Sequence, residues 1–123
     1  MAAKRSMVLI SLFACPAFCA PDERFVASLR RLDPDMRLEQ ICDYEAMTQI
    51  GQADRAKSYV ISPPLHVGNT LKANGGAFRR NGAWFRVSFV CTATADHLRV
   101  LSFKLKVGGL IPRGSWQAYG LWD

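Results

Sequence analysis

Residues 75–107 read GGAFRRNGAWFRVSFVCTATADHLRVLSFKLKV, and this stretch sets the architecture expected for the whole chain. Three runs within it alternate between apolar and polar residues, and Asn81-Gly82 and Ala95-Asp96-His97 separate them. An alternation of period two is typical of strands with one buried face, and Asn-Gly is the favoured two-residue hairpin turn. The stretch is therefore predicted to be an antiparallel meander of three strands.

The two turns also predict which side chains share a face of this sheet. The Asn81-Gly82 turn places Phe78 opposite Phe85 and Arg79 opposite Trp84. A three-residue second turn at residues 95–97 would pair position 89 with position 103. Alternation then predicts an inner face made of Phe85, Val87, Phe89, Cys91, Ala93, Leu101, Phe103, Leu105 and Val107.

The opposite face of the predicted sheet is basic, and it is the candidate binding face. In the register above, Arg86 lies opposite Lys106, and like charges at such positions cost stability. The simplest interpretation is a solvated face on which Arg79 lies over the Trp84 ring. The functional interpretation is a surface for an anionic ligand or partner, formed by Arg79, Trp84, Arg86, Lys104 and Lys106.

Two helices are predicted upstream, over residues 22–31 and from Pro34 to about Ile50. Asp33 is a good helix cap, Pro34 suits the first helical position, and Gly51 is a good terminator. In the second helix, apolar residues recur every fourth position, at Leu38, Cys42, Ala46 and Ile50. The expected fold class is therefore α+β, with two N-terminal helices packed on one face of the meander.

The segments between and after these elements give weaker signals. Residues 58–62 are predicted to be a strand that ends at two prolines, and residues 67–73 are a second candidate strand. Asn74-Gly75-Gly76 suggests a turn or a close approach of two backbones. In the C-terminal tail, Trp116, Tyr119 and Trp122 are expected to pack over the open end of the core, the alternative being an exposed aromatic edge.

The N-terminus has the pattern of a secretory signal peptide over residues 1–20. Lys4-Arg5 precede an apolar run that is too short to span a bilayer, and small residues precede the polar Pro21-Asp22-Glu23. Cleavage is expected after Cys19 or after Ala20. The alternatives are lipoprotein processing at Cys15 and a buried N-terminal helix, which Pro16 would break.

Removal of this segment would leave two cysteines, Cys42 and Cys91, in an exported domain of residues 21–123. An even pair outside the cytoplasm predicts a disulfide, although two buried free thiols are the alternative. Such a bond would close a loop of about 50 residues and contribute about 4 kcal/mol. No metal or other cofactor is expected, because the two cysteines, His66 and His97 lack the spacing of metal ligands.

Composition and motifs favour a binding or structural module over an enzyme. The 123 residues suffice for one domain, and the net charge of +6 permits an anionic partner without requiring one. No nucleophile motif or phosphate loop occurs, and an enzyme acting on envelope polymers is the alternative. A nucleic-acid partner is not expected for an exported chain, and any membrane contact is expected to be peripheral.

Several segments of the sequence resemble a bacterial family catalogued as a domain of unknown function, number 930. They are Leu32–Asp43, Ala46-Met47, Ile50, Gly68–Ala73, Gly76–Arg79, Trp84–Cys91, Ala95–His97, Val100–Phe103, Ile111-Pro112 and Trp116. The resemblance covers residues 32–116 and implies an alphaproteobacterial, envelope-facing protein in the periplasm or secreted. Longer members look as if a membrane anchor and a proline-rich linker precede the domain. The family brings no assigned activity and no catalytic residues.

Overall fold

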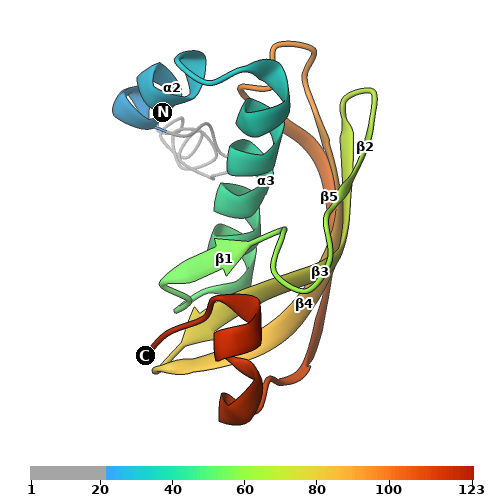
Figure 1. The fold of residues 1–123 in the computed structure, drawn as a ribbon. Helices are drawn as coiled ribbons and strands as arrows, with labels where there is room; N and C mark the ends of the chain where they lie inside the picture. The colour runs from blue at the N-terminus through green and yellow to red at the C-terminus, as the bar shows by residue number, and fades with distance from the viewer. Residues whose placement is uncertain (1–21) are drawn as a thin grey trace, which may run out of the picture.

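The computed structural model describes residues 22–123, so the predicted signal peptide and Cys15 lie outside the described residues. Two helices, α2 (Glu23–Arg30) and α3 (Pro34–Ile50), precede a mixed-length antiparallel sheet. Its strands are β1 (Arg55–Lys57), β2 (Leu65–Val67), β3 (Thr70–Arg80), β4 (Ala83–Ala93) and β5 (Val100–Leu110). The order across the sheet is β1-β3-β4-β5, and β2 also pairs with β3. The predicted α+β class is confirmed, with α3 lying along one face of a curved sheet (Figure 1).

Both helices begin after an aspartate cap, and α3 begins and ends at the capping residues predicted for it. The Asp22 carboxylate accepts the backbone N–H groups of Arg24 and Phe25, at 2.8 and 3.2 Å. Asp33 caps α3 in the same way, since it accepts the N–H of residue 36 at 3.0 Å. Gly51 follows α3 with φ of 74°, a conformation that favours glycine.

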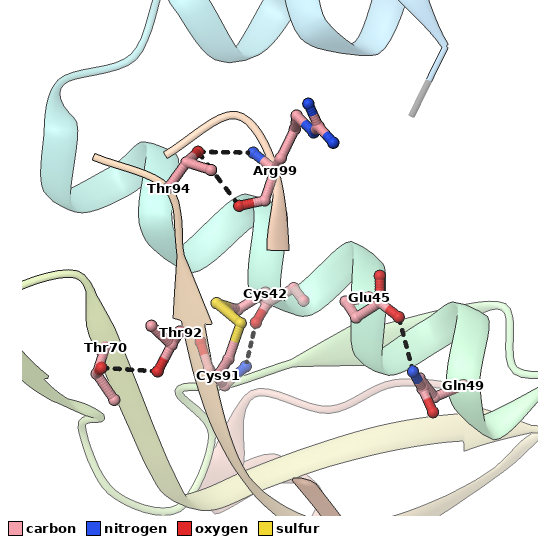
Figure 2. The surroundings of a disulfide bond; sticks show 10 residues. Cys42, Glu45, Gln49, Thr70, Cys91, Thr92, Thr94 and Arg99 are labelled. Atoms are coloured by element: carbon pink, nitrogen blue, oxygen red, sulfur yellow. Dashed lines mark hydrogen bonds between the residues drawn. A yellow bond between two sulfur atoms is a disulfide. The ribbon is translucent and has the colours of Figure 1, made fainter. Parts of the chain in front are cut away.

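A disulfide joins the middle of α3 to the C-terminal part of β4. Cys42 and Cys91 are bonded with their Cα atoms 6.0 Å apart, and both are fully buried (Figure 2). This confirms the predicted pair and the face of the helix that contacts the sheet. The core around the bond consists of Leu29, Leu38, Ile41, Ala46, Leu71, Ala73, Phe89, Ala93 and Leu98.

The first hairpin has the predicted turn and register. Asn81 and Gly82 both have positive φ, at 53° and 75°, as a type I′ turn requires. Phe78 pairs with Phe85, and the two rings stack with centroids 5.2 Å apart. The register of β3 against β4 is therefore set by the two-residue turn, up to a bulge at residues 73–76.

The predicted register of β4 against β5 is wrong by two residues, because the second turn is longer than three residues. Phe89 pairs with Leu105 and Cys91 with Phe103. Hydrogen bonds of the Thr94 side chain close the loop instead. Its Oγ1 contacts the Arg99 backbone (Figure 2). It also donates to the Asp96 carboxylate, and His97 adopts φ of 59°.

A bulge beside Ala93 changes the face of one predicted core residue. Leu101 is 59% exposed, so its predicted place on the inner face is wrong. Val107 stays on the inner face, opposite Val87, but is 49% exposed. Phe103 and Leu105 do pack against the core, as predicted. A shift of two residues keeps every side chain on its original face, so Lys104 and Lys106 still point away from α3.

The segment between α3 and β3 differs from its prediction. The strand expected at residues 58–62 is absent, and the polar residues 55–57 form β1 instead, because they pair with residues 77–79 of β3. Residues 58–62 cross β3 at Gly75, where an added Cβ would lie 2.2 Å from Ser62 Oγ. The predicted close approach of two backbones at this glycine is thus confirmed.

Within residues 22–123, no helix has both the length and the apolar character needed to cross a membrane.

Candidate binding face

The sheet surface that faces away from α3, called the outer face here, is divided into a covered half and an open half. The covered half lies near the β3–β4 turn, where the tail packs on it in two short turns, Arg113–Ser115 and Gln117–Tyr119 (Figure 1). The open half is made by side chains of the three long strands. They are Lys72, Asn74, Arg86, Ser88, Val90, Lys104 and Lys106.

Trp84 belongs to the covered half and does not present its ring to solvent, contrary to the sequence-based expectation. It is 0% exposed, and its Nε1 donates to the Trp122 carbonyl at 2.8 Å. Trp116 is also buried and donates to the Ile111 carbonyl at 2.9 Å. A second hydrophobic cluster therefore exists around Trp84, and the tail covers the sheet face rather than the open end of the main core.

Arg79 is held in place by a carboxylate. It donates to both oxygens of Asp54, at 3.0 and 2.8 Å, and its guanidinium lies 5.9 Å from the centre of the Trp84 ring. The hydrogen bond from Arg79 and its positive charge lower the pKa of the Asp54 carboxyl. The predicted contact of Arg79 with Trp84 is confirmed, but this cation is already paired and belongs to the covered half.

The other three predicted cations, Arg86, Lys104 and Lys106, lie together on the open half and are exposed. Lys72 joins them, because it pairs with Val90, which pairs in turn with Lys104. Lys72 and Lys104 therefore flank one central residue, at two strand spacings or about 10 Å apart. None of the four forms an ion pair with another of the described residues.

Shallow hollows and neutral polar groups accompany these cations. Two depressions of about 200 and 210 Å³ adjoin one another on the open half, and both include Asn74, Ser88 and Lys106 in their walls. Farther along, Thr70 and Thr92 share a hydrogen bond of 2.8 Å. The open half thus offers cations and neutral hydrogen-bonding groups, which is the chemistry that phosphate, sulfate or carboxylate groups need.

Charge is unevenly distributed between the two layers of the fold. The strands β3, β4 and β5 contain six Lys and Arg residues and no Asp or Glu. The two helices with their caps carry seven of the ten acidic residues of the chain against four arginines. An anion is therefore attracted to the sheet side of the molecule and repelled from the helix side.

Asp43 is the one described carboxyl whose pKa is strongly raised. Burial raises its pKa from 3.8 to about 7, although its carboxylate accepts the Ser58 backbone N–H at 3.0 Å. Glu39, one turn earlier on α3, adds to the increase through its charge. A hollow of about 180 Å³ lies beside Asp43, with walls that include Gln40, Tyr44 and Arg55.

The two histidines have structural partners on separate elements. His97 is buried between the Pro34 carbonyl and the Asn69 side chain, at 2.8 and 2.9 Å. His66 contacts Glu39 at 2.7 Å and so ties β2 to α3. No group of three or more potential metal ligands is found within residues 22–123.

A family model described as Domain of Unknown Function (DUF930) matches residues 29–121, which is most of the chain. The chain belongs to this family. The match includes both core clusters, the disulfide and every residue of the open half. It also confirms the resemblance found in the sequence and extends it at both ends. Among curated proteins and among solved structures, no significant match to the chain was found.

The binding face predicted from the sequence did not include Lys72, which β3 adds to the open half. That strand was predicted only as a candidate, so no register linked Lys72 to β4. The available signal was the alternation of Leu71 and Ala73 with Lys72, which places the lysine on the side opposite two buried residues.

Proposed function

We propose that this protein is a non-enzymatic binding module of the cell envelope of an alphaproteobacterium, exported to the periplasm by its N-terminal signal peptide. Its open half is the binding surface, and its ligand is a polyanionic component of the envelope. The observation that carries the proposal is the group of four exposed cations, Lys72, Arg86, Lys104 and Lys106, without carboxylate partners among the described residues. The disulfide supports export, because such bonds persist mainly in oxidising compartments.

The geometry of the open half suits an extended or planar anionic surface better than a small enclosed ligand. Its depressions are shallow, and the cations come from three adjacent strands rather than from the walls of a cleft. Attraction of about 1 kcal/mol per basic residue near an anionic surface is typical, so four cations give reversible, salt-sensitive association.

Binding to anionic vesicles and to a soluble polyanion tests this function directly. The probes are phosphatidylglycerol–phosphatidylcholine vesicles and dextran sulfate, compared at low and physiological salt. Exchange of Arg86 and Lys104 together for Glu should weaken binding at least about tenfold, since four units of charge change on one surface. Loss with vesicles alone would identify lipid headgroups as the ligand, and loss with both probes a general polyanion.

A matched control changes the same charge on the helix side. Exchange of the exposed Arg24 and Arg31 for Glu alters the net charge equally but lies on and beside α2. This variant should keep most of the binding. Equal weakening in both double variants would show that only net charge matters, and would remove the open half as the site.

Asp43 is the observation that favours the alternative, a small hydrolase or modifying enzyme acting on envelope polymers. A carboxyl with a raised pKa beside a hollow suits a general acid. The carboxylate is, however, occupied by the Ser58 backbone N–H and helps to join α3 to the end of β1. Release of fragments from purified peptidoglycan, abolished by Asp43→Asn, would establish the enzyme in place of the binding module.

A further inference from the structure

The two edges of the sheet differ in whether their backbone groups are paired. The edge of β3 that faces away from β4 pairs with β1, with β2 and with the crossing segment at Gly75. On the other side, β5 is the last strand and pairs only with β4 among residues 22–123. At eleven residues, β5 is long for an edge strand, and it contains no proline.

The backbone of β5 presents free hydrogen-bonding groups along this edge. On one side of β4, the Ile111 N–H donates to the Trp84 carbonyl at 2.8 Å, and on the other the Ala93 N–H donates to the Asn69 carbonyl at 2.9 Å. Along a strand, the backbone N–H and C=O groups of successive residues point alternately to the two neighbouring strands. Even-numbered residues of β4, such as Ser88 and Val90, therefore point these groups toward β5, as Trp84 does. Their partners Lys106 and Lys104 therefore point their backbone groups at β4, whereas Phe103, Leu105 and Val107 point theirs at the open edge.

The side chains of β5 define what kind of strand fits this edge. Lys104 and Lys106 lie side by side on the outer face, and residues 103, 105 and 107 are apolar on the inner face. A second copy is a poor occupant of the middle of this strand. Antiparallel pairing of two β5 strands about Leu105 sets Lys104 against Lys106 of the partner copy, and pairing about Lys104 sets that lysine against itself. Like charges directly opposite one another oppose both arrangements.

We infer that β5 is a docking edge for an extended segment of a partner protein in which acidic and apolar residues alternate. The partner strand continues the sheet by backbone hydrogen bonds to Phe103, Leu105 and Val107. Its acidic side chains lie beside Lys104 and Lys106 on the outer face. Its apolar side chains lie beside residues 103, 105 and 107 on the inner face. The straight run from Ser102 to Val107, free of register shifts, accommodates about six residues of such a segment.

The test uses the oxidised protein and a synthetic peptide of alternating glutamate and valine. Amide hydrogen exchange by NMR is measured with and without the peptide. The N–H groups of Phe103, Leu105 and Val107 should exchange rapidly in the free protein and slow at least about tenfold when the peptide is bound. The N–H groups of Lys104 and Lys106, which already pair with β4, should change little.

Two controls separate edge pairing from charge attraction. A peptide with N-methyl groups at its central amides keeps its charge but cannot donate, and it should bind at least about tenfold more weakly. The variant with Lys104→Glu and Lys106→Glu should prefer a lysine–valine peptide instead. Equal binding of the N-methylated peptide, absence of protection at the three edge amides, or protection that grows with protein concentration alone would each overturn the inference.

Vesicle binding by the open half and peptide docking at β5 can be lost independently of one another. Vesicle binding by the open half does not need a donor on the ligand backbone, whereas peptide docking does. Protection of the β5 edge without vesicle binding would leave the docking edge in place and remove the polyanion site, and the reverse result would do the opposite.

Discussion

Asp43 is a single side chain that links the helix layer to the sheet layer at a thermodynamic cost. Its carboxylate receives one backbone N–H, from Ser58, but burial disfavours its charged form and raises its pKa to about 7. In the unfolded chain an aspartate titrates near 3.8. Between these two values the folded protein keeps a proton that the unfolded chain has lost, so the free energy of unfolding falls as pH rises.

Replacement of Asp43 by Asn should remove this pH dependence. The wild type is expected to lose a few kcal/mol of unfolding free energy between about pH 4 and pH 7, at 1.36 kcal/mol per pKa unit. The variant should have a flatter profile and should be the more stable form at pH 8. Urea denaturation at several pH values measures both, and parallel profiles for the two proteins would show that Asp43 is not buried as described.

At the scale of elements, the turns determined how much could be predicted. Asn81-Gly82 has one favoured conformation, so the first hairpin and its pairs followed from the sequence. The second turn depends on bonds made by the Thr94 and Asp96 side chains and on the burial of His97 against α3, which local pattern does not contain. The predicted register of this turn and the predicted inner-face position of Leu101 were therefore wrong.

The C-terminal tail is the element whose role was least visible in the sequence. Trp84 alternates with Phe85 as an outer residue should, yet the tail converts that position into the centre of a second cluster. Coverage of an outer face depends on which remote segment packs on it. For this reason the candidate face retained its cations Arg86, Lys104 and Lys106 but lost its aromatic member.

Trp84→Ala should lower the free energy of unfolding by about 3–5 kcal/mol, the usual cost of a large core truncation. Trp122→Ala is the matched variant, because that ring is 41% exposed and touches the same cluster from outside. It should cost clearly less in urea denaturation. Similar losses in the two variants would mean that the tail does not seal Trp84 from solvent.

For the whole molecule, the disulfide joins the two layers between which charge is separated. The bond joins an acidic helix layer to a basic sheet layer and fixes which face of the sheet stays open. Fold class, helix limits and the cysteine pair were predictable because capping, periodicity and pairing are local or combinatorial signals. The extent of the open half was not, because it depends on how the C-terminal tail packs over the rest of the outer face.

Export and oxidation of this protein can be measured together by mass spectrometry of the native protein from cells fractionated without reductant. We expect a periplasmic chain that begins near residue 20 and yields one peptide pair joined through Cys42 and Cys91. A cytoplasmic chain that retains residues 1–20 and carries both sulfurs as free thiols would contradict this expectation.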